Sequence, residues 1–217
     1  MAMYVDRRHA GEYLSKLLEG WKGGSGIVLA IPNGGALVAV PIAVNLALDL
    51  RLAVVRKIQF PGNPEAGFGA VGLLDTVGLD EGLLKHHPLA PRVVEEQKRK
   101  ALVSVRERIQ RFGPWAQLPL LDNRDVLLVD DGLATGSTME AAVRIVRAHG
   151  PSRVVVAVPT SSHRAWKRLH TVVDEIICPH VSRLPVFAVA DAYENWYDVQ
   201  EDEVLRILEE NLGRPGG

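Results

Sequence analysis

Cysteine is almost absent from this chain. Cys178 is the only cysteine among 217 residues, which excludes an internal disulfide and leads us to expect a reducing compartment, the cytoplasm. Because Cys178 ends an apolar run and is followed by Pro179, we interpret it as a buried residue at the end of a strand and not as a nucleophile.

An excess of charge of either sign is also missing. The 25 Lys and Arg residues against 26 Asp and Glu give a net charge of −1, so the composition predicts no attraction to nucleic acid or to an anionic membrane. The N-terminus lacks the apolar region of a signal peptide. Residues 26–48 carry no charge and could span a bilayer by length, but PNGG at 32–35 interrupts them. We expect a strand, a sharp loop and a buried helix there, and no membrane partner.

Apolar runs alternate with amphipathic patterns along the chain. Strands are predicted at 26–31, 51–57, 125–130, 153–158 and 172–178, and helices at 6–21, 35–49, 91–112, 137–149, 163–170 and 202–212. Continuous Val, Ile and Leu runs are typical of parallel strands that are covered on both faces. The pattern therefore predicts an α/β fold, a doubly wound, mainly parallel twisted sheet with helices on both faces. Ligands of such sheets bind outside the carboxyl ends of the strands.

Composition also suggests how the chain is divided. We predict a core over residues 1–180, which includes a long irregular and mobile loop at about 58–90 that is rich in Gly and Pro. Residues 181–217 are predicted to form a small C-terminal hood with a candidate strand at 186–190 and a last helix.

The run VLLVDDGLATGST, residues 126–138, carries the main chemical signal. Adjacent carboxylates are costly to bury without partners, so Asp130 and Asp131 at the end of a strand should meet a ligand. The turn that follows opens a helix, whose first N–H groups favour an anion. Ribose 5-phosphate offers hydroxyls to the carboxylates and a phosphate to the turn. A simple helix cap would explain two carboxylates alone, but the full pattern favours the ligand site.

This run resembles the phosphoribosyl pyrophosphate (PRPP) signature of the type I phosphoribosyltransferases. The order of elements is similar to that family from about residue 26 to 178. The resemblance implies that Asp130 and Asp131 hold the ribose 2′- and 3′-hydroxyls. It also implies that the 5′-phosphate is wrapped by Ala134, Thr135, Gly136, Ser137 and Thr138.

The resemblance extends to the pyrophosphate side of the site. Asn33, Gly34 and Gly35 stand where the family has its pyrophosphate loop, which often carries an Arg or Lys in place of Asn33. The pair Arg56-Lys57 resembles the family's basic residue that meets pyrophosphate; the alternative is a strand-end lysine in solvent. PGNPEAGFGAVG, residues 61–72, resembles the mobile catalytic loop but lacks the Ser-Tyr pair of many such loops.

The implied reaction is the displacement of pyrophosphate from ribose C1 by a nitrogen acceptor, a Mg²⁺-dependent pentosyl transfer. The candidate catalytic residues are Lys57, Asp130, Asp131 and, as a base, Glu65. Mg²⁺ would take most of its ligands from PRPP and water; no metal ligand is assigned, and the two aspartates would reach the ion only through ribose hydroxyls or water. Ala134 stands where most 6-oxopurine enzymes have Asp, so the motif is more similar to the adenine and orotate branches.

The acceptor side is less defined. Phe187, Tyr193 and Trp196 could stack on a flat base, or could simply fasten the last helix. The tail and RKIQFPGNPE in the loop resemble a branch whose acceptor is unassigned. The alternative to an enzyme is a regulator that senses PRPP or a nucleotide. Regulators of this family add a basic face or a DNA-binding domain, and the composition of this chain indicates neither, so we favour the enzyme. The expected partners are PRPP, a nitrogen acceptor and a second copy of the chain in a homodimer.

Overall fold

A computed structural model describes residues 2–72 and 76–215, apart from the side chains of residues 64 and 65. The α-helices are α1 (Arg7–Leu17), α2 (Gly34–Leu46), α3 (Glu81–His86), α4 (Pro91–Phe112), α5 (Ser137–Arg147), α6 (His163–Leu169) and α7 (Glu201–Leu212). The strands are β1 (Ile27–Ala30), β2 (Asp49–Leu52), β3 (Arg56–Phe60), β4 (Asn63–Val71), β5 (Val77–Leu79), β6 (Asp125–Val129), β7 (Arg153–Ala157), β8 (Thr160–Ser162), β9 (Glu175–Ile177) and β10 (His180–Ser182). Short 3₁₀ turns are η1 (Glu19–Trp21), η3 (Gly113–Ala116) and η4 (Val189–Ala192).

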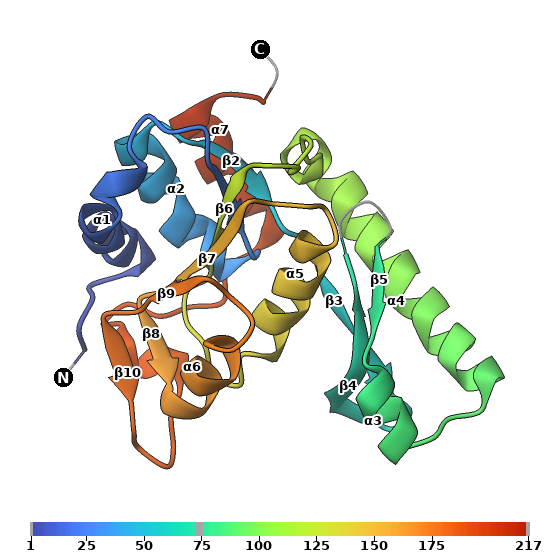
Figure 1. Cartoon of the computed structure of the whole chain (residues 1–217). Helices are drawn as coiled ribbons and strands as arrows, with labels where there is room; N and C mark the ends of the chain where they lie inside the picture. The colour runs from blue at the N-terminus through green and yellow to red at the C-terminus, as the bar shows by residue number, and fades with distance from the viewer. Residues whose placement is uncertain (1, 73–75, 216–217) are drawn as a thin grey trace.

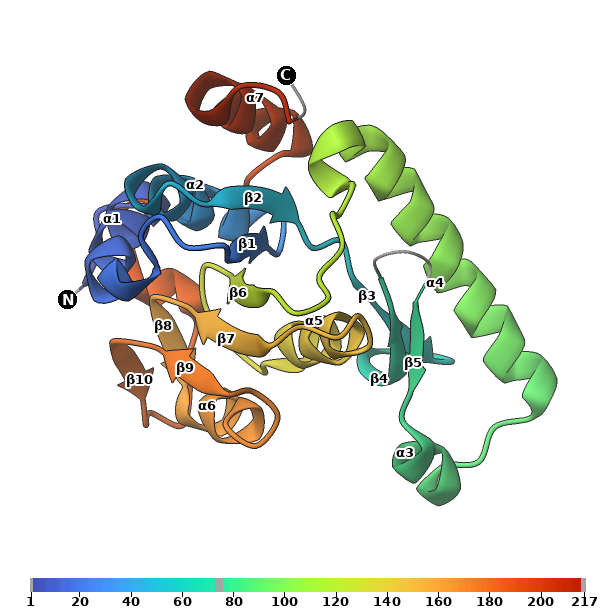
Figure 2. The same ribbon diagram turned by 45° about the horizontal axis from the view of Figure 1, so that its top comes forward.

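A five-stranded parallel sheet forms the centre of the molecule, in the order β2-β1-β6-β7-β9 (Figure 1). Helices α1, α2 and α7 cover one face, and α5 and α6 cover the other (Figure 2). Alternate strand residues therefore enter different cores: Val28 and Leu127 pack with the first group of helices, and Ile27 and Val126 with the second. This arrangement confirms the predicted doubly wound α/β fold.

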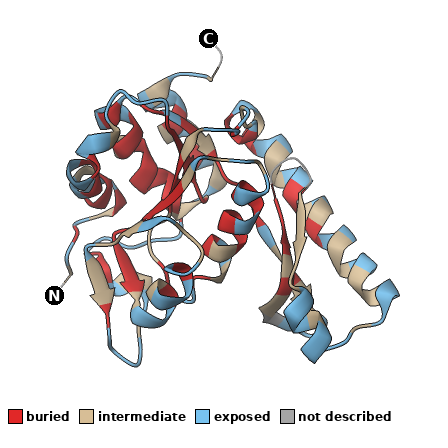
Figure 3. Ribbon diagram, in the orientation of Figure 1, coloured by how far each residue is buried: buried red, intermediate tan, exposed pale blue. Residues whose placement is uncertain are grey.

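The central strands are buried, whereas much of α4 faces solvent (Figure 3). Burial on both faces explains why these strands read as continuous apolar runs. Residues 26–48 form β1, a loop and α2, as predicted. No helix within residues 2–72 and 76–215 combines the length and apolarity needed to cross a bilayer.

The segment after β2 differs from the prediction. The expected strand 51–57 is divided between β2, in the central sheet, and β3, which begins a second sheet in the order β3-β4-β5. Residues 58–90 were expected to be irregular, but their described part contains this antiparallel sheet and α3. We call β3, β4, β5 and α3 the arm. Ile58 and Phe68 of the arm are fully buried and belong to the same apolar core as α4 and the central sheet. This packing stabilises strands that the glycines and prolines make hard to predict from the sequence.

The C-terminal third also contains differences. The candidate strand at 186–190 is wrong: the chain runs through an open segment, in which Val186 is 83% exposed, into η4. The short parallel pair β8–β10 was not predicted. Cys178 follows β9 and is half-buried; its thiol donates to His180 O at 3.2 Å, and burial raises its pKa to about 12. A neutral thiol agrees with the structural role that we expected for it.

Candidate functional site

The site lies where β1 and β6 end. These strands are adjacent and parallel, with Ala30 opposite Val129, so the loops that follow them meet at one edge of the sheet. Residues 32–35 form the end of the loop after β1 and the start of α2, and residues 130–136 form the loop after β6. Both loops match positions where the sequence predicted ligand contacts.

Asp131 forms a buried ion pair that the sequence did not reveal. The Nε atom of Arg7 donates to Asp131 Oδ2 at 2.8 Å, and Arg7 is only 4% exposed. A second guanidinium nitrogen of Arg7 donates to Tyr197 O at 3.0 Å, and its Cζ lies 3.9 Å from the ring centroid of Trp196. Stacking and hydrogen bonding thus fix the arginine, and the arginine fixes one edge of the Asp131 carboxylate.

Asp130 lies in a different electrostatic environment. Its Oδ1 accepts from the backbone N–H of Asp131 at 2.9 Å. Burial, followed by repulsion from the neighbouring Asp131 carboxylate, raises the pKa of Asp130 well above its ordinary value of 3.8. Hydrogen-bond donors on a ligand, such as ribose hydroxyls, would stabilise the ionised form of this carboxyl group. Asp130 is therefore suited to bind a polyhydroxylated ligand.

The glycines of residues 32–35 bring backbone directly against these aspartates. A Cβ atom on Gly34 would overlap Asp131 Oδ2, and one on Gly35 would lie 2.8 Å from Val129 O and 2.9 Å from Asp130 Cα. Any side chain here would push the two loops apart. The peptide bond between Pro32 and Asn33 is cis.

The Asn33 side chain turns toward other elements. Its Oδ1 accepts from a terminal guanidinium nitrogen of Arg108 at 2.7 Å, and its Nδ2 donates to Val199 O at 2.8 Å. Arg108, on α4, also pairs with Glu201 at 2.8 Å. The position where the family often has a basic residue is thus linked to a cation from a distant helix.

The turn that opens α5 is held in a defined conformation. Gly136 precedes the helix with φ of 73°, and a Cβ there would lie 3.1 Å from that of Ala165, so both conformation and space favour glycine. Ser162 Oγ donates to Ala134 O at 2.7 Å, which ties the turn to β8. The hydroxyls of Thr135 and Ser137 lie 3.0 Å apart, and Thr138 is exposed. The result is a rigid, hydroxyl-rich helix start that can receive an anion.

Two cavities flank this turn. One, of about 580 Å³, is lined by Ala134, Thr135 and Ser137, and also by Phe187. The other, of about 500 Å³, is lined by Ser137 and by Lys57 of the arm. Arg56, the first residue of β3, is exposed. The structure therefore brings Lys57 and Phe187 to cavities that share Ser137.

The remaining predicted residues lie elsewhere. Tyr193 is 5% exposed; its hydroxyl donates to Asp131 O at 2.6 Å, and burial raises its pKa. Trp196 covers the guanidinium of Arg7. These two rings surround Arg7, whereas Phe187 lines the cavity beside the α5 turn. Glu65 belongs to β4, but its side chain lies outside the described residues.

The described residues contain no group of three His, Cys, Asp or Glu side chains that could hold a metal ion. Asp130 and Asp131 provide carboxylate oxygens where β6 ends, and such oxygens are suitable ligands for Mg²⁺. This donor set fits an ion that is held mainly by a substrate and water.

Sequence reasoning did not identify Arg7 or Arg108 as site residues. Each belongs to an amphipathic helix rich in charge, where an arginine normally faces solvent. Only the pairing of Arg7 with Asp131, 124 positions away, distinguishes it. A local pattern contains no signal for such a contact.

Comparison with known proteins decides the family. A model of the phosphoribosyl transferase domain matches residues 5–191. The chain belongs to this family. The crystal structure of TT1426 from Thermus thermophilus is similar, with a TM-score of 0.86 and 36% identity over 97% of this chain and 99% of that one. The family assignment made from VLLVDDGLATGST is therefore confirmed.

Two further comparisons define how much the likeness shows. The chain is 34% identical over 209 residues to "Putative phosphoribosyl transferase Rv0571c" of Mycobacterium tuberculosis (strain ATCC 25618 / H37Rv), covering 96% of this chain and 47% of that protein. It thus spans about half the length of the curated relative. A hypoxanthine phosphoribosyltransferase from Staphylococcus aureus has a TM-score of 0.50 and 12% identity, over 82% of this chain and 73% of that one, which shows a common fold only.

Proposed function

We propose that this phosphoribosyl transferase domain transfers the 5-phosphoribosyl group of PRPP to a nitrogen acceptor, with release of pyrophosphate. One observation carries the proposal: two adjacent carboxylates at the end of β6 stand directly before the hydroxyl-rich turn that opens α5. A ribose bearing a 5′-phosphate offers complementary groups to both parts.

Each part of the site has a defined task in this reaction. Asp130 and Asp131 accept hydrogen bonds from the ribose 2′- and 3′-hydroxyls, with Arg7 holding Asp131 in place. The backbone and hydroxyls of residues 134–138 hold the 5′-phosphate. Gly34 and Gly35 present backbone to the pyrophosphate beside the carboxylates. Fixing the sugar at two ends orients C1 toward the acceptor, which is the main catalytic contribution expected of such a protein.

Positive charge would stabilise the negatively charged leaving group, pyrophosphate. Lys57 lines the cavity that reaches the α5 turn and is suited to meet a pyrophosphate oxygen. A magnesium ion on the pyrophosphate would supply further positive charge to the leaving group. Glu65 of β4 remains the candidate base for an acceptor that must lose a proton. Closure of the arm over PRPP would exclude water from C1.

The test removes the sugar-binding charges and leaves the rest of the strand unchanged. Asp130→Asn combined with Asp131→Asn should abolish PRPP binding in calorimetry with Mg²⁺. Asp125→Asn, at the opposite end of β6, is the matched control and should bind PRPP as the unaltered protein does. Unchanged PRPP affinity in the double variant would refute the site.

A second measurement separates an enzyme from a sensor. Nucleobases and related nitrogen heterocycles are incubated with PRPP and Mg²⁺, pyrophosphate is detected, and the product is identified by mass spectrometry. Formation of a ribonucleotide supports transfer. Tight PRPP binding with no product from any acceptor would favour the alternative, a regulator that senses PRPP.

A further inference from the structure

The cavity of about 580 Å³ beside the α5 turn is positively charged. Three arginines line it, namely Arg164 and Arg168 of α6 and Arg183, which follows β10. Hydroxyls of Thr135 and Ser162 also line it, and no Asp or Glu is among its described lining residues. The cavity therefore combines cations and hydrogen-bond donors without a carboxylate to balance them.

Acidic residues compensate these arginines poorly, in contrast to the arginines of the neighbouring helix α5. Arg164 and Arg183 form no ion pair with any residue in the described ranges, and Arg168 has one long contact, 3.7 Å to Glu140. By contrast, Arg144 and Arg147 of the neighbouring α5 pair with acidic residues at 2.9 and 2.6 Å. All three arginines of the cavity are exposed, so their charge is available to an anionic ligand.

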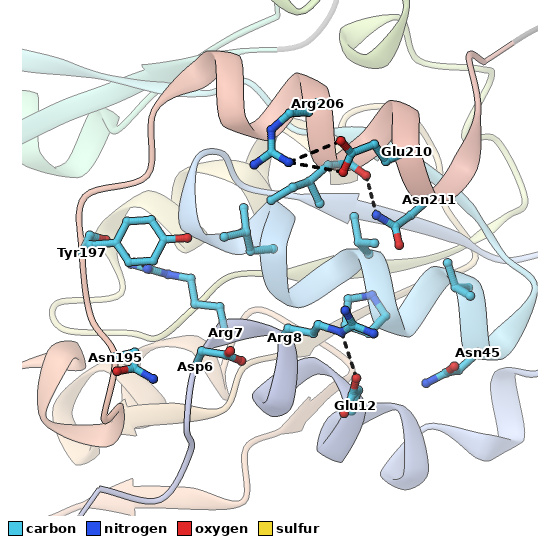
Figure 4. A pocket seen from close by; sticks show the side chains of 15 residues that line it. Asp6, Arg7, Arg8, Glu12, Asn45, Asn195, Tyr197, Arg206, Glu210 and Asn211 are labelled. Carbon is cyan, nitrogen blue, oxygen red and sulfur yellow. Dashed lines mark hydrogen bonds and ion pairs between the residues drawn. The ribbon is translucent and has the colours of Figure 1, made fainter.

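A second cavity shows what a balanced site looks like in this protein. It has a volume of about 490 Å³ and lies between α1, α2 and α7 (Figure 4). Two of its three arginines pair with acidic residues of the same cavity, Arg8 with Glu12 at 3.1 Å and Arg206 with Glu210 at 3.3 Å, and the third, Arg7, pairs with Asp131. Unlike this second cavity, the cavity beside α5 is lined by arginines that have no close acidic partner among the described residues.

The 5′-phosphate of PRPP does not account for all of this charge. In the proposed function, residues 134–138 and the start of α5 hold that phosphate through backbone N–H groups and hydroxyls. Arg164 and Arg183 belong to other elements, α6 and the segment after β10. Their guanidinium groups remain available to the other reactant, the acceptor.

The apolar wall of the cavity beside α5 favours a ligand with a flat ring. Phe187 is half-buried and, with Leu184 and Pro185, lines the same cavity as the arginines. Leu184 is 72% exposed, so it has apolar surface that a flat ligand could cover. A ligand that matches this wall has an aromatic or conjugated ring with an anionic group on its edge, because guanidinium binds carboxylate in a planar, two-point geometry.

We infer that the acceptor is a nitrogen heterocycle that bears a ring carboxylate, recognised by Arg164 and Arg183. This inference rests on the proposed function and names its second substrate by class. It also assigns a specificity role to two arginines that contact neither the sugar-binding carboxylates nor the pyrophosphate loop.

The experiment compares ring pairs that differ in the carboxylate: orotate with uracil, and nicotinate with nicotinamide. Binding to the PRPP-loaded protein is measured by calorimetry, and pyrophosphate release is measured with Mg²⁺. In at least one pair, the carboxylated ring should bind at least tenfold more tightly, and any turnover should show the same preference. Equal binding of both members of each pair, or tighter binding of the neutral member, would overturn the inference.

Variants then test whether Arg164 and Arg183 cause the preference for the carboxylated ring. Arg164→Gln combined with Arg183→Gln should remove the preference, through a weaker affinity for the carboxylated ring, while PRPP affinity stays within about twofold. Arg206→Gln, in the balanced cavity, is the control and should keep the preference. A preference that survives the double variant would refute the assignment to these arginines.

Failure of the proposed function would give a different result. The unaltered protein would then not bind PRPP at all, which calorimetry with PRPP alone detects.

Discussion

Asp130 and Asp131 are adjacent in sequence but differ in charge compensation. Arg7 donates to Asp131 at 2.8 Å. Asp130 accepts a backbone hydrogen bond instead, and burial beside Asp131 raises its pKa. One carboxylate is therefore stabilised by the fold, whereas the other is destabilised until a ligand arrives. Such a division between stability and function is typical of binding sites.

This difference leads to a prediction on pH and stability. The raised pKa means that folded Asp130 binds a proton more readily than unfolded Asp130. The contribution of this residue to folding therefore decreases as pH rises from its ordinary value of 3.8 through the raised one. Asp130→Asn removes the penalty and should raise the free energy of unfolding at neutral pH by about 1–3 kcal/mol, although we expect it to weaken PRPP binding.

Thermal or urea unfolding across pH 3 to 8 measures this effect. The advantage of the Asn variant should be absent at the acid end and should grow as pH rises. Asp125→Asn, at the other end of β6, should change stability by less than about 0.5 kcal/mol. An Asn variant that is less stable than the unaltered protein at neutral pH would contradict the assigned environment of Asp130.

For single residues, local sequence patterns predicted only some members of the site. Asp130, Asp131 and Gly136 could be predicted because their roles depend on neighbours within ten positions: a strand end, a turn and a helix start. Arg7 depends on Asp131, Tyr197 and Trp196, which lie far away in sequence. Its sequence context predicts only a charged helix.

Among the elements, the arm was the one that sequence patterns described poorly. Pro61 and Gly62 form a two-residue connection between β3 and β4, with Phe60 opposite Asn63 and Gly62 at φ of 74°. Proline followed by glycine is a turn signal, but the glycines of the following strand suggested an irregular loop. By contrast, α4 was predicted with its correct bounds, because 22 residues of amphipathic repeat give a strong helical signal.

One of those glycines is required by strand pairing. A Cβ on Gly69 would lie 2.6 Å from Gly78 O on β5 and 3.1 Å from a methyl of Leu79, whereas a Cβ on Gly78 would have nothing within 4 Å. Gly69→Ala should therefore separate β4 from β5, at a cost of about 1–3 kcal/mol. Gly78→Ala is the matched control and should leave the pairing intact.

Hydrogen exchange at β5 measures the local effect. Two amides join these strands: Asp80 N donates to Phe68 O at 2.8 Å, and Gly72 N donates to Thr76 O at 3.1 Å. In the Gly69 variant these amides should exchange faster, whereas those of the central sheet should be unchanged. Equal protection of β5 in the two variants would show that β4 and β5 do not pair as described.

At the scale of the whole molecule, the N-terminal segment meets residues 192–195 beside the site. Tyr193 pairs with Tyr4 in a parallel bridge, and the Tyr4 carbonyl accepts from Glu194 N at 2.9 Å. Tyr4 is 3% exposed, and its hydroxyl donates to Pro159 O at 3.1 Å. The N-terminal segment is therefore built into the C-terminal region, and α1 begins directly after it. This closure positions Arg7 between the hood and Asp131.

Arg7 consequently joins three parts of the molecule, and its removal should affect both stability and binding. Arg7→Ala leaves Asp131 without its buried partner, which typically costs about 3–5 kcal/mol, and PRPP affinity should fall because Asp131 is no longer held. Arg8→Ala removes the adjacent arginine, whose side chain is 79% exposed and pairs with Glu12 one turn away; the expected cost is below about 0.5 kcal/mol.

Unfolding measurements on both variants, combined with Asp131→Asn in a double-mutant cycle, separate the ion pair from other effects of Arg7. If the pair is the main interaction, Asp131→Asn should recover part of the stability that Arg7→Ala loses, because the unpaired buried charge disappears. Additive losses would show instead that Arg7 acts through Trp196 and Tyr197.

Calorimetry measures the effect of Arg7 on binding. Arg7→Ala should weaken PRPP binding at temperatures where the variant is still folded, and Arg8→Ala should not. Equal PRPP affinity in the two variants would mean that Arg7 supports the fold but not the binding role that we propose for Asp131.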